Sequence, residues 1–161
     1  MNNLITDKYH FFWHGLFSQW NESPFVIDHE HYITAEQFMM SMKSKMFGDY
    51  DVLKEVMSTS SPKIQKALGR KVKNFDNDLW QKHCYEIVLK GNLAKYRQSK
   101  AHYDALLFTG KRMLVEASPY DKIWGIGMDI DHPDILDENK WLGTNLLGKV
   151  LMDVRKILIE A

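Results

Sequence analysis

Apolar residues recur three and four positions apart along most of this chain, the spacing that places them on one face of an α-helix. This pattern predicts helices at residues 35–47, 49–57, 62–68, 77–96, 100–108 and 145–160. Shorter apolar runs beside turn residues predict strands: a hairpin at 25–28 and 31–34 in FVIDHEHYIT, and one more strand in MLVEAS. The fold class that we predict is therefore mainly α, a single compact helical domain with a few short β-strands.

Two segments lack a regular pattern. The N-terminal region is aromatic and irregular, with Phe11, Phe12, Trp13, Phe17 and Trp20 close together. The second segment runs from 118 to 143 and is rich in Gly, Asp and Pro, which predicts a long loop. Binding residues concentrate in such segments, so both are expected near a functional site.

Length and composition indicate one soluble domain. The 161 residues are 45% hydrophobic, enough for one compact core, and no Pro-, Gly- or Ser-rich stretch divides residues 1–161. No apolar run reaches membrane-spanning length, and the N-terminal segment lacks a secretory pattern. We therefore expect a cytoplasmic protein that does not associate with a membrane.

Opposite charges balance over the whole chain, with 21 Lys and Arg against 21 Asp and Glu. A neutral protein has no strong field to attract nucleic acid, so the balance favours a small ligand or a modified base over tight duplex binding. Locally, KIQKALGRKVK at 63–73 carries basic side chains and no acid. Such a run is either a solvated helix face or a grip for phosphate, and the sequence leaves both open.

The stretch WLGTNLLGKV at 141–150 resembles a phosphate-binding loop, but Val150 stands where that loop needs a hydroxyl for magnesium. A helix start explains the residues better. Thr144 is predicted to cap a helix that begins at Asn145, and Gly148 is predicted to lie where another backbone comes close. The first N–H groups of this helix would then be free to bind an anion.

Thr34 and Gln37 form a capping-box pattern at the start of TAEQFMMSMKSKMF, which fixes where that helix begins. On a helical wheel the Phe and Met side chains of this stretch cover one broad arc. The opposite side is predicted to be polar, because Gln37, Ser41, Ser44 and Lys45 lie there together.

Glu36 and Lys43 do not belong to that polar side, because they project among the Met and Phe side chains, about 10 Å from each other along one face. An unpaired charge among apolar side chains costs several kcal/mol, so such groups pair, shift their pKa or line a wet cavity. Two interpretations remain. Either Lys43 reaches outward from the edge while Glu36 stabilises the helix start, or both lie on the floor of a pocket whose Met and aromatic walls accept a flat ring.

A second group of polar residues surrounds a tryptophan in LVEASPYDKIWGIGMD. Glu116 and Asp121 come before Trp124, and Gly125 lets the backbone approach another group closely or turn sharply. Trp124 either stacks on a base or belongs to the core of a tight loop.

Several blocks together resemble the NADAR family, also called YbiA-like. They are FSQW with SPF, YITAEQFMMSMKSKMFGD, LGR, LLFTGKRMLVEASPYDKIWGIG and WLGTNLLGKVLMDVR, in the family's order and over residues 12–158. The resemblance implies a mainly helical fold and an N-glycosidase. It implies one of two substrates, ADP-ribosylated guanine in nucleic acid or a ribosylamino-pyrimidine phosphate of riboflavin synthesis, and points to an ADP-ribosyltransferase as a partner protein.

Residue by residue, the resemblance implies that Glu36, Lys43 and Asp121 are catalytic. It implies a ligand-binding role for a larger set: Ser18, Trp20, Arg70, Glu116, Trp124, Gly125 and Asn145. One position departs from the family, because Gln19 follows Ser18 where the family usually has Asn.

These residue types suit cleavage of an N-glycosidic bond. That reaction builds positive charge on ribose C1, and the Glu36 carboxylate would stabilise the charge or activate water. Asp121 would protonate the departing base. Lys43 either attacks a ring-opened sugar to form an imine or clamps charge, while Arg70 or the helix end at Asn145 would meet phosphate.

No metal or cofactor is expected for this chemistry, and His10 with His14 lacks the third ligand that a catalytic zinc site needs. Two interpretations compete with an enzyme. One is a non-catalytic module that binds ADP-ribose or a nucleotide, and the other is a protein-interaction domain.

Overall fold

The computed structural model describes residues 3–161. Helices predominate over a few short strands in this range, which confirms the predicted fold class. The chain divides into two compact units: unit 1 comprises Met1–Ser18 and Lys100–Ala161, and unit 2 comprises Gln19–Ser99. A single domain over residues 1–161 stays a prediction. Within the described range, no helix combines the length and the hydropathy needed to cross a membrane.

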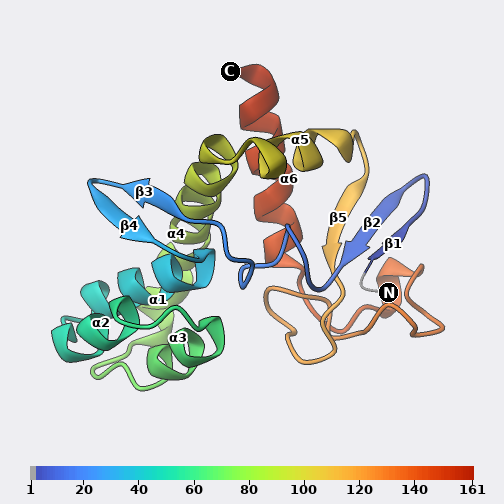
Figure 1. Ribbon diagram of the computed structural model, residues 1–161. Helices are drawn as coiled ribbons and strands as arrows, with labels where there is room; N and C mark the ends of the chain where they lie inside the picture. Colours follow the sequence, from blue (N-terminus) through green and yellow to red (C-terminus); the bar gives the residue numbers. More distant parts are fainter. Residues whose placement is uncertain (1–2) are drawn as a thin grey trace. The chain divides into compact units, whose positions relative to one another are not determined.

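Unit 2 consists of a β-hairpin followed by helices (Figure 1). The hairpin pairs β3 (Phe25–Ile27) with β4 (Glu30–Tyr32) in antiparallel register. The helices are α1 (Ala35–Met46), α2 (Tyr50–Met57), α3 (Pro62–Gly69) and α4 (Asn77–Gln98). All four helices begin and end close to the predicted bounds. Each start is marked in the sequence by an N-cap side chain: Thr34, Asp49, Ser61 and Asp76.

Helix α1 lies at the centre of unit 2 and packs against α2, α3 and α4. The polar side predicted for α1 is covered by the neighbouring helices, because Gln37, Ser41 and Ser44 are 0 or 1% exposed. Gln37 Nε2 donates to Val56 O at 3.0 Å. The Ser41 and Ser44 hydroxyls donate to carbonyls of their own helix at 2.7 and 2.8 Å. A helical wheel does not distinguish small polar residues that bond the backbone from solvated ones.

Unit 1 is built on a three-stranded sheet in the order β1 (Asn3–Ile5), β2 (Tyr9–Phe12) and β5 (Met113–Glu116). β2 pairs antiparallel with β1 and parallel with β5. The expectation of an irregular N-terminal region is therefore wrong for β1 and β2. The sequence signal failed because β2 is buried along its whole length, so it reads as an aromatic run without alternation.

Two helices and a long loop complete unit 1. They are α5 (Lys100–Phe108), α6 (Leu146–Glu160) and the loop after β5, which contains one short 3₁₀ turn, η1 (Glu138–Lys140). α6 packs directly on β5 (Figure 1). A Cβ added at Gly148 would lie 2.0 Å from Leu114 O, so the close backbone approach predicted for Gly148 is confirmed.

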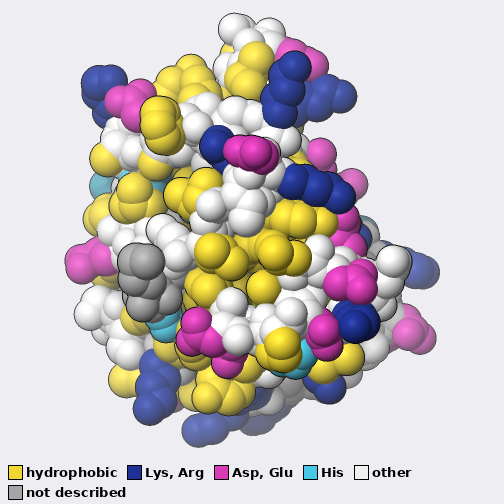
Figure 2. All heavy atoms as spheres, turned by 90° about the vertical axis from the view of Figure 1, so that its right-hand side faces the viewer, with side chains coloured by type: hydrophobic (Ala, Val, Ile, Leu, Met, Phe, Trp, Pro, Cys, Tyr) yellow, Lys and Arg dark blue, Asp and Glu magenta, His cyan; other side chains and the backbone are white. Residues whose placement is uncertain are grey.

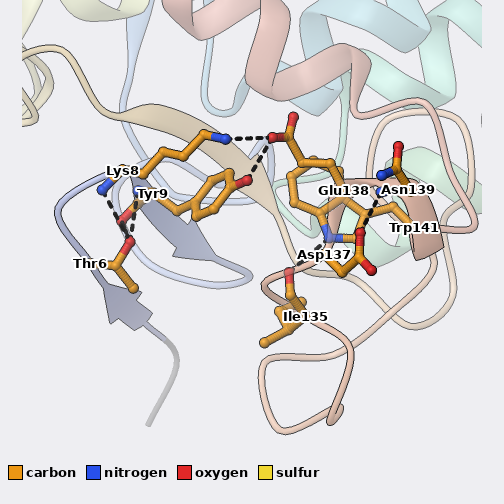
Figure 3. A network of polar contacts seen from close by, with 8 residues as sticks. All are labelled: Thr6, Lys8, Tyr9, Ile135, Asp137, Glu138, Asn139 and Trp141. Carbon is orange, nitrogen blue, oxygen red and sulfur yellow. Dashed lines mark hydrogen bonds and ion pairs between the residues drawn. The ribbon is translucent and has the colours of Figure 1, made fainter.

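The long loop of unit 1 is fastened to the sheet by side chains at the start of β2 (Figure 3). Tyr9 OH donates to Glu138 Oε2 at 2.6 Å, and Lys8 Nζ lies 2.9 Å from the same oxygen. These two donors, Tyr9 first, hold the pKa of the Glu138 carboxyl below its usual value. Trp141 Nε1 donates to Ile135 O at 2.8 Å. The predicted loop is thus held in one conformation by specific contacts.

On the face of the molecule drawn in Figure 2, hydrophobic side chains form a broad central area, and acidic and basic side chains are scattered around it. Neither sign predominates on this face. It therefore does not resemble the strongly basic surface with which proteins grip a nucleic acid backbone.

Candidate functional site

Glu36 lies in the first turn of α1, and the cap of that helix fixes its place. Thr34 Oγ1 accepts the Gln37 N–H at 3.0 Å, as the capping-box pattern predicts. The Gln37 side chain reaches one residue further back than in a capping box, because its Oε1 accepts the Ile33 N–H at 2.7 Å. Glu36 itself is buried, with 6% exposed. Its charge therefore has to be balanced by the groups around it.

Lys43 follows Glu36 by about two turns and is half-buried among aromatic rings. Its Nζ lies 4.5 Å from the ring centroid of Phe75 and 5.8 Å from that of Trp80. Burial lowers the pKa of the Lys43 amine, the Glu36 carboxylate raises it, and the Arg70 guanidinium lowers it further. Because the lowering prevails, more of Lys43 is the neutral amine at a given pH than for a solvated lysine.

The structure thus brings three predicted residues together, since the charges of Glu36 and Arg70 both act on Lys43. Arg70 comes from the end of α3, which approaches α1 closely. A Cβ added at Gly69 would lie 1.9 Å from Met40 Sδ, so the Met40 side chain packs directly on this glycine. The LGR block therefore places its arginine beside the charged face of α1. This group of Glu36, Lys43 and Arg70 is called the charged cluster below.

Asp49 holds the segment that carries Phe75. One of its carboxylate oxygens caps α2 by accepting the Val52 N–H at 3.1 Å, and the other accepts the Lys73 N–H at 2.9 Å. These backbone donors, Lys73 first, hold the pKa of Asp49 below its usual value. Phe75 packs edge-on against Phe47, with 5.3 Å between the ring centroids. The segment of Phe75, one aromatic neighbour of Lys43, is therefore held by the side chain that caps α2.

Ser18 is the last residue of its segment of unit 1, and Trp20 belongs to unit 2. Ser18 is buried, and its N–H donates to Gly15 O at 3.1 Å. Trp20 is 41% exposed, and the Nζ of Lys66 lies 6.0 Å from its ring centroid. An accessible indole beside a cation suits stacking on a flat anionic ligand. Binding by Ser18 and Trp20 stays a prediction.

The remaining predicted residues lie in unit 1, where residues 117–127, the Trp124 loop, turn around Asp121. Its Oδ1 accepts the N–H groups of Ile123 and Trp124, each at 2.8 Å. Gly125 is enclosed by backbone, because a Cβ there would lie 2.9 Å from both Asp121 O and Glu116 O. The close approach predicted for Gly125 is confirmed. Asp121 shapes this loop, and its role as a proton donor stays a prediction.

The start of α6 differs from the prediction. Asn145 occupies the N-cap position at φ 53°, and Thr144 Oγ1 donates instead to Ile123 O at 2.6 Å. The N–H groups of Leu146 and Leu147 donate to carbonyls of the Trp124 loop at 3.1 and 3.0 Å. They are not free for an anion, so the prediction of free N–H groups is wrong for these two residues, and phosphate binding at this helix end stays a prediction. Folding of the Trp124 loop over the helix start could not be read from local spacing.

Asn145 joins α6 to the end of β5. Its Nδ2 donates to Leu114 O at 3.0 Å, and its Oδ1 accepts the Glu116 N–H at 3.0 Å. Both polar atoms of this buried amide thus bond the backbone of β5. Asn145 therefore fixes the main chain from which Glu116 projects, and contact of either residue with a ligand stays a prediction.

The apolar arc of α1 borders a groove of about 360 Å³ against α4. Its lining is mostly apolar and comprises Phe38, Met42, Met46, Leu79, His83, Glu86, Ile87 and Lys90. This lining contains none of the residues predicted to bind or react. Lys43 lies instead beside Phe75 and Trp80, so α1 presents two chemically different faces.

His10 and His14 have aromatic neighbours. The ring of His10 meets Phe17 edge-on at 5.3 Å, and the ring of His14 stacks on Trp13 at 4.5 Å. Burial lowers the pKa of His10, which favours its neutral form. Within residues 3–161, no group of three or more His, Cys, Asp or Glu side chains is spaced to hold a metal ion.

Two sets of neighbours were missed by the sequence reasoning. Phe75 and Trp80 contact the Lys43 amine, yet they follow it by more than a whole helix in the chain. Asn92 contacts Gln19 from the middle of α4. The available signal was weak: an exposed Phe in the polar stretch KNFDND, and an Asn inside a long helix, where its propensity is poor.

Three similarities to known proteins bear on this site. The family model described as the NADAR domain matches residues 10–159. The chain is similar to N-glycosidase R617 of Acanthamoeba polyphaga mimivirus, with 44% identity over 95% of this chain and 98% of that protein. It is also similar to N-glycosidase Npun_R5314 of Nostoc punctiforme, with 29% identity over 89% of this chain and 85% of that protein. The solved structure of the E. coli protein YbiA is similar with a TM-score of 0.79 and 25% identity, over 99% of this chain and 90% of that one.

Proposed function

Because this chain belongs to the NADAR family, we propose that it hydrolyses the N-ribosyl bond of a phosphorylated substrate. The family resemblance of the sequence blocks is confirmed, and so is N-glycosidase as the general enzyme class. The proposed substrate is ADP-ribose attached to guanine in nucleic acid or a ribosylamino-pyrimidine phosphate of riboflavin synthesis. Both contain a ribose C1–N bond, a flat heterocycle and phosphate.

The observation that carries this proposal is the charged cluster. It combines a buried acid, an amine whose pKa is lowered and a guanidinium, with aromatic rings beside the amine. A structural ion pair needs only two opposite charges. The positive charge of Arg70 repels that of Lys43 and so lowers the stability of the fold. Such an excess of positive charge is expected where a substrate supplies the missing negative charge.

Glu36 is proposed to act at ribose C1. As the C1–N bond breaks, positive charge develops on C1 and the ring oxygen, and a carboxylate nearby stabilises it. The same carboxylate can accept a proton from the attacking water, whose oxygen bonds to C1. The departing nitrogen takes up a proton, for which Asp121 is the proposed donor.

Lys43 is proposed to react with the sugar in its ring-opened form. Only a neutral amine is nucleophilic, and the lowered pKa of Lys43 increases that fraction. Ring opening of the substrate leaves C1 joined to the base nitrogen as an imine. Attack of the Lys43 amine on C1 would release the base as an amine and form an imine with Lys43, and water would then give the C1 aldehyde and restore the Lys43 amine. A charge clamp is the competing role, in which Lys43 stays protonated and pairs with the substrate.

Arg70 is proposed to bind the phosphate. Its side chain is exposed at the end of α3, and its charge acts on Lys43. A guanidinium presents paired donors that match phosphate oxygens. Since the N–H groups of Leu146 and Leu147 already bond the Trp124 loop, we favour Arg70 among the two candidates that the sequence suggested.

Incubation with two substrates tests the proposed function. ADP-ribosylated guanine oligonucleotide and a ribosylamino-pyrimidine phosphate are each mixed with the enzyme, and mass spectrometry measures the released ribosyl product. Release from one of them identifies the substrate class. Binding of both without release would instead support a non-catalytic module.

Borohydride separates the two roles of Lys43. Reduction in the presence of substrate converts an imine to a stable amine adduct, which peptide mapping would locate at Lys43. Lys45→Arg leaves the adduct in place because Lys45 lies in an ion pair with Glu30, whereas Lys43→Arg abolishes it. Absence of any adduct during turnover supports the clamp.

A further inference from the structure

Gln19 and Asn92 form a buried amide pair in unit 2. Asn92 Nδ2 donates to Gln19 Oε1 at 2.7 Å and to Val88 O at 2.9 Å. Asn92 is 0% exposed and Gln19 is 8% exposed. The pair therefore joins the segment before the hairpin to the middle of α4, within the interior of this unit.

Gln19 also touches the start of α1 through its main chain. Its carbonyl accepts the Glu36 N–H at 3.1 Å. The first N–H groups of a helix have no partner within the helix, so an outside acceptor holds that turn in place. The Gln19 Nε2 lies 4.0 Å from Met39 Sδ, one turn further along α1. Side chain and main chain of Gln19 thus connect Asn92 to the turn that carries Glu36.

The pair of Gln19 and Asn92 stabilises the interior less than apolar side chains of the same shape would. Asn92 Oδ1 is buried and has no hydrogen-bond partner among the described residues. Leaving a buried acceptor unsatisfied destabilises the folded state, and an apolar side chain of the same shape avoids that cost. Space is tight at this level of α4, because a Cβ at Gly91 would lie 2.6 Å from Phe38 Cδ2. An apolar residue would serve the packing alone.

We propose that Asn92 is a positioning residue for the reaction: it holds the Gln19 side chain, and the Gln19 carbonyl holds the helix turn from which Glu36 projects. This inference rests on the proposed function for the role of Glu36. The lengths of the two side chains are matched to the gap between their backbones. Shortening Gln19 by one methylene withdraws its amide by about 1.5 Å, beyond hydrogen-bond reach.

A length swap tests the positioning role. Gln19→Asn and Asn92→Leu each break the bond and are expected to lower kcat about 10-fold or more with little change in KM, because a displacement of about 1 Å in a reacting group is costly. The double variant Gln19→Asn with Asn92→Gln restores the combined length and is expected to regain most of kcat. Unchanged kcat in Asn92→Leu, or a double variant that regains nothing, overturns the proposal.

A second measurement is independent of activity. Hydrogen exchange of the Glu36 amide, followed by NMR in the full chain, reports whether its bond to the Gln19 carbonyl holds. We expect at least about 10-fold faster exchange in Gln19→Asn and in Asn92→Leu, with the Lys45 amide of the same helix as an unaffected reference. Equal Glu36 exchange in wild type and both variants overturns the link. If wild type cleaves neither substrate, the proposed function fails, and exchange alone decides the positioning.

Discussion

At the scale of single residues, Lys43 combines a stability cost with a chemical use. Burial removes the Lys43 ammonium from water, which destabilises the folded protein. Cation–π attraction to the Phe75 and Trp80 rings offsets about 0.5–2 kcal/mol of that cost. The lowered pKa shows that the surroundings still disfavour the charge. A buried residue that lowers stability in this way is expected where it contributes to activity.

Replacement of Lys43 by methionine is therefore expected to separate stability from activity. Lys43→Met removes the buried charge while it keeps most of the side-chain volume, so the Tm should stay equal or rise. Turnover should fall about 100-fold or more. Lys45→Met is the matched control, since Lys45 lies on the same helix in a partly exposed ion pair that contributes little. A lower Tm with full activity in Lys43→Met would refute this role.

The stability difference between wild type and Lys43→Met should depend on pH. The pKa of Lys43 lies below 10.5 in the folded protein and near 10.5 in the unfolded chain. The burial cost of the charge is thus fully present below the folded pKa and disappears as pH rises towards 10.5. When thermal unfolding of both proteins is measured from pH 7 upward, the Tm of wild type should rise relative to that of Lys43→Met. A Tm difference that does not change with pH, or a wild-type Tm that falls relative to the variant, contradicts the lowered pKa of Lys43.

At the scale of elements, N-caps and glycines set the geometry of both units. The caps Thr34, Asp49, Ser61 and Asp76 have clear local signals, and for this reason the sequence predicted the helices of unit 2 well. Glycines that permit a crossing, such as Gly69 and Gly148, show their role only when the partner element is known. The sequence predicted that another segment of backbone lies close to Gly148, but it could not show that this segment is β5.

Failures of prediction at this scale have two physical causes, burial of a strand and contacts with other parts of the chain. Burial on all sides removes the periodic signal, as in β2. The free helix end predicted at Asn145 failed because a loop far away in the chain supplies the acceptors. Glu36 and Lys43 were recognisable because charges stood out on an apolar arc. Phe75 beside Lys43 and Asn92 beside Gln19 come from other parts of the chain and gave no comparable signal.

The crossing of α6 on β5 predicts a large effect for one methyl group. Gly148→Ala places a Cβ against Leu114 O and 2.4 Å from Asn145 Nδ2, so the Asn145 contacts must shift. We expect a loss of about 1–3 kcal/mol in the free energy of unfolding, measured by urea denaturation. Lys149→Ala, the exposed neighbour, should change it by less than about 0.5 kcal/mol. Equal stabilities of the two variants would show that the crossing is not close-packed.

The two aspartate caps of unit 2 provide a matched pair for the site. Asp49 and Asp76 both cap helices, but only Asp49 also holds Lys73 and so the Phe75 segment. Asp49→Ala and Asp76→Ala should both lower the Tm at neutral pH. Both should also reduce kcat, and Asp49→Ala the more, because Asp49 holds the segment of Phe75 while Asp76 caps the helix that carries Trp80. The Asp49 contribution is present above pH 3.8 and is lost as pH falls below that value, because its folded pKa is depressed. A greater loss of kcat in Asp76→Ala would contradict this view of the site.

At the scale of the whole molecule, charge balance limits how a nucleic acid substrate could be held. The chain has no net charge, and the face in Figure 2 mixes both signs. Contacts with few phosphates release few counterions. If the substrate is a modified base in an oligonucleotide, kcat/KM should fall by less than about 10-fold between 50 and 200 mM salt. A fall of about 1,000-fold would instead indicate an extended basic surface.

The most direct test of the central claim compares wild type with Glu36→Gln on the substrate that wild type cleaves. The substitution keeps the size of the side chain but replaces the charged carboxylate, which is proposed to stabilise C1, with a neutral amide. Mass spectrometry of the released ribosyl product under single-turnover conditions should show cleavage by wild type and a rate at least about 100-fold lower for Glu36→Gln. Equal single-turnover rates for the two proteins would contradict the assignment of Glu36, and with it the charged cluster, to the reaction.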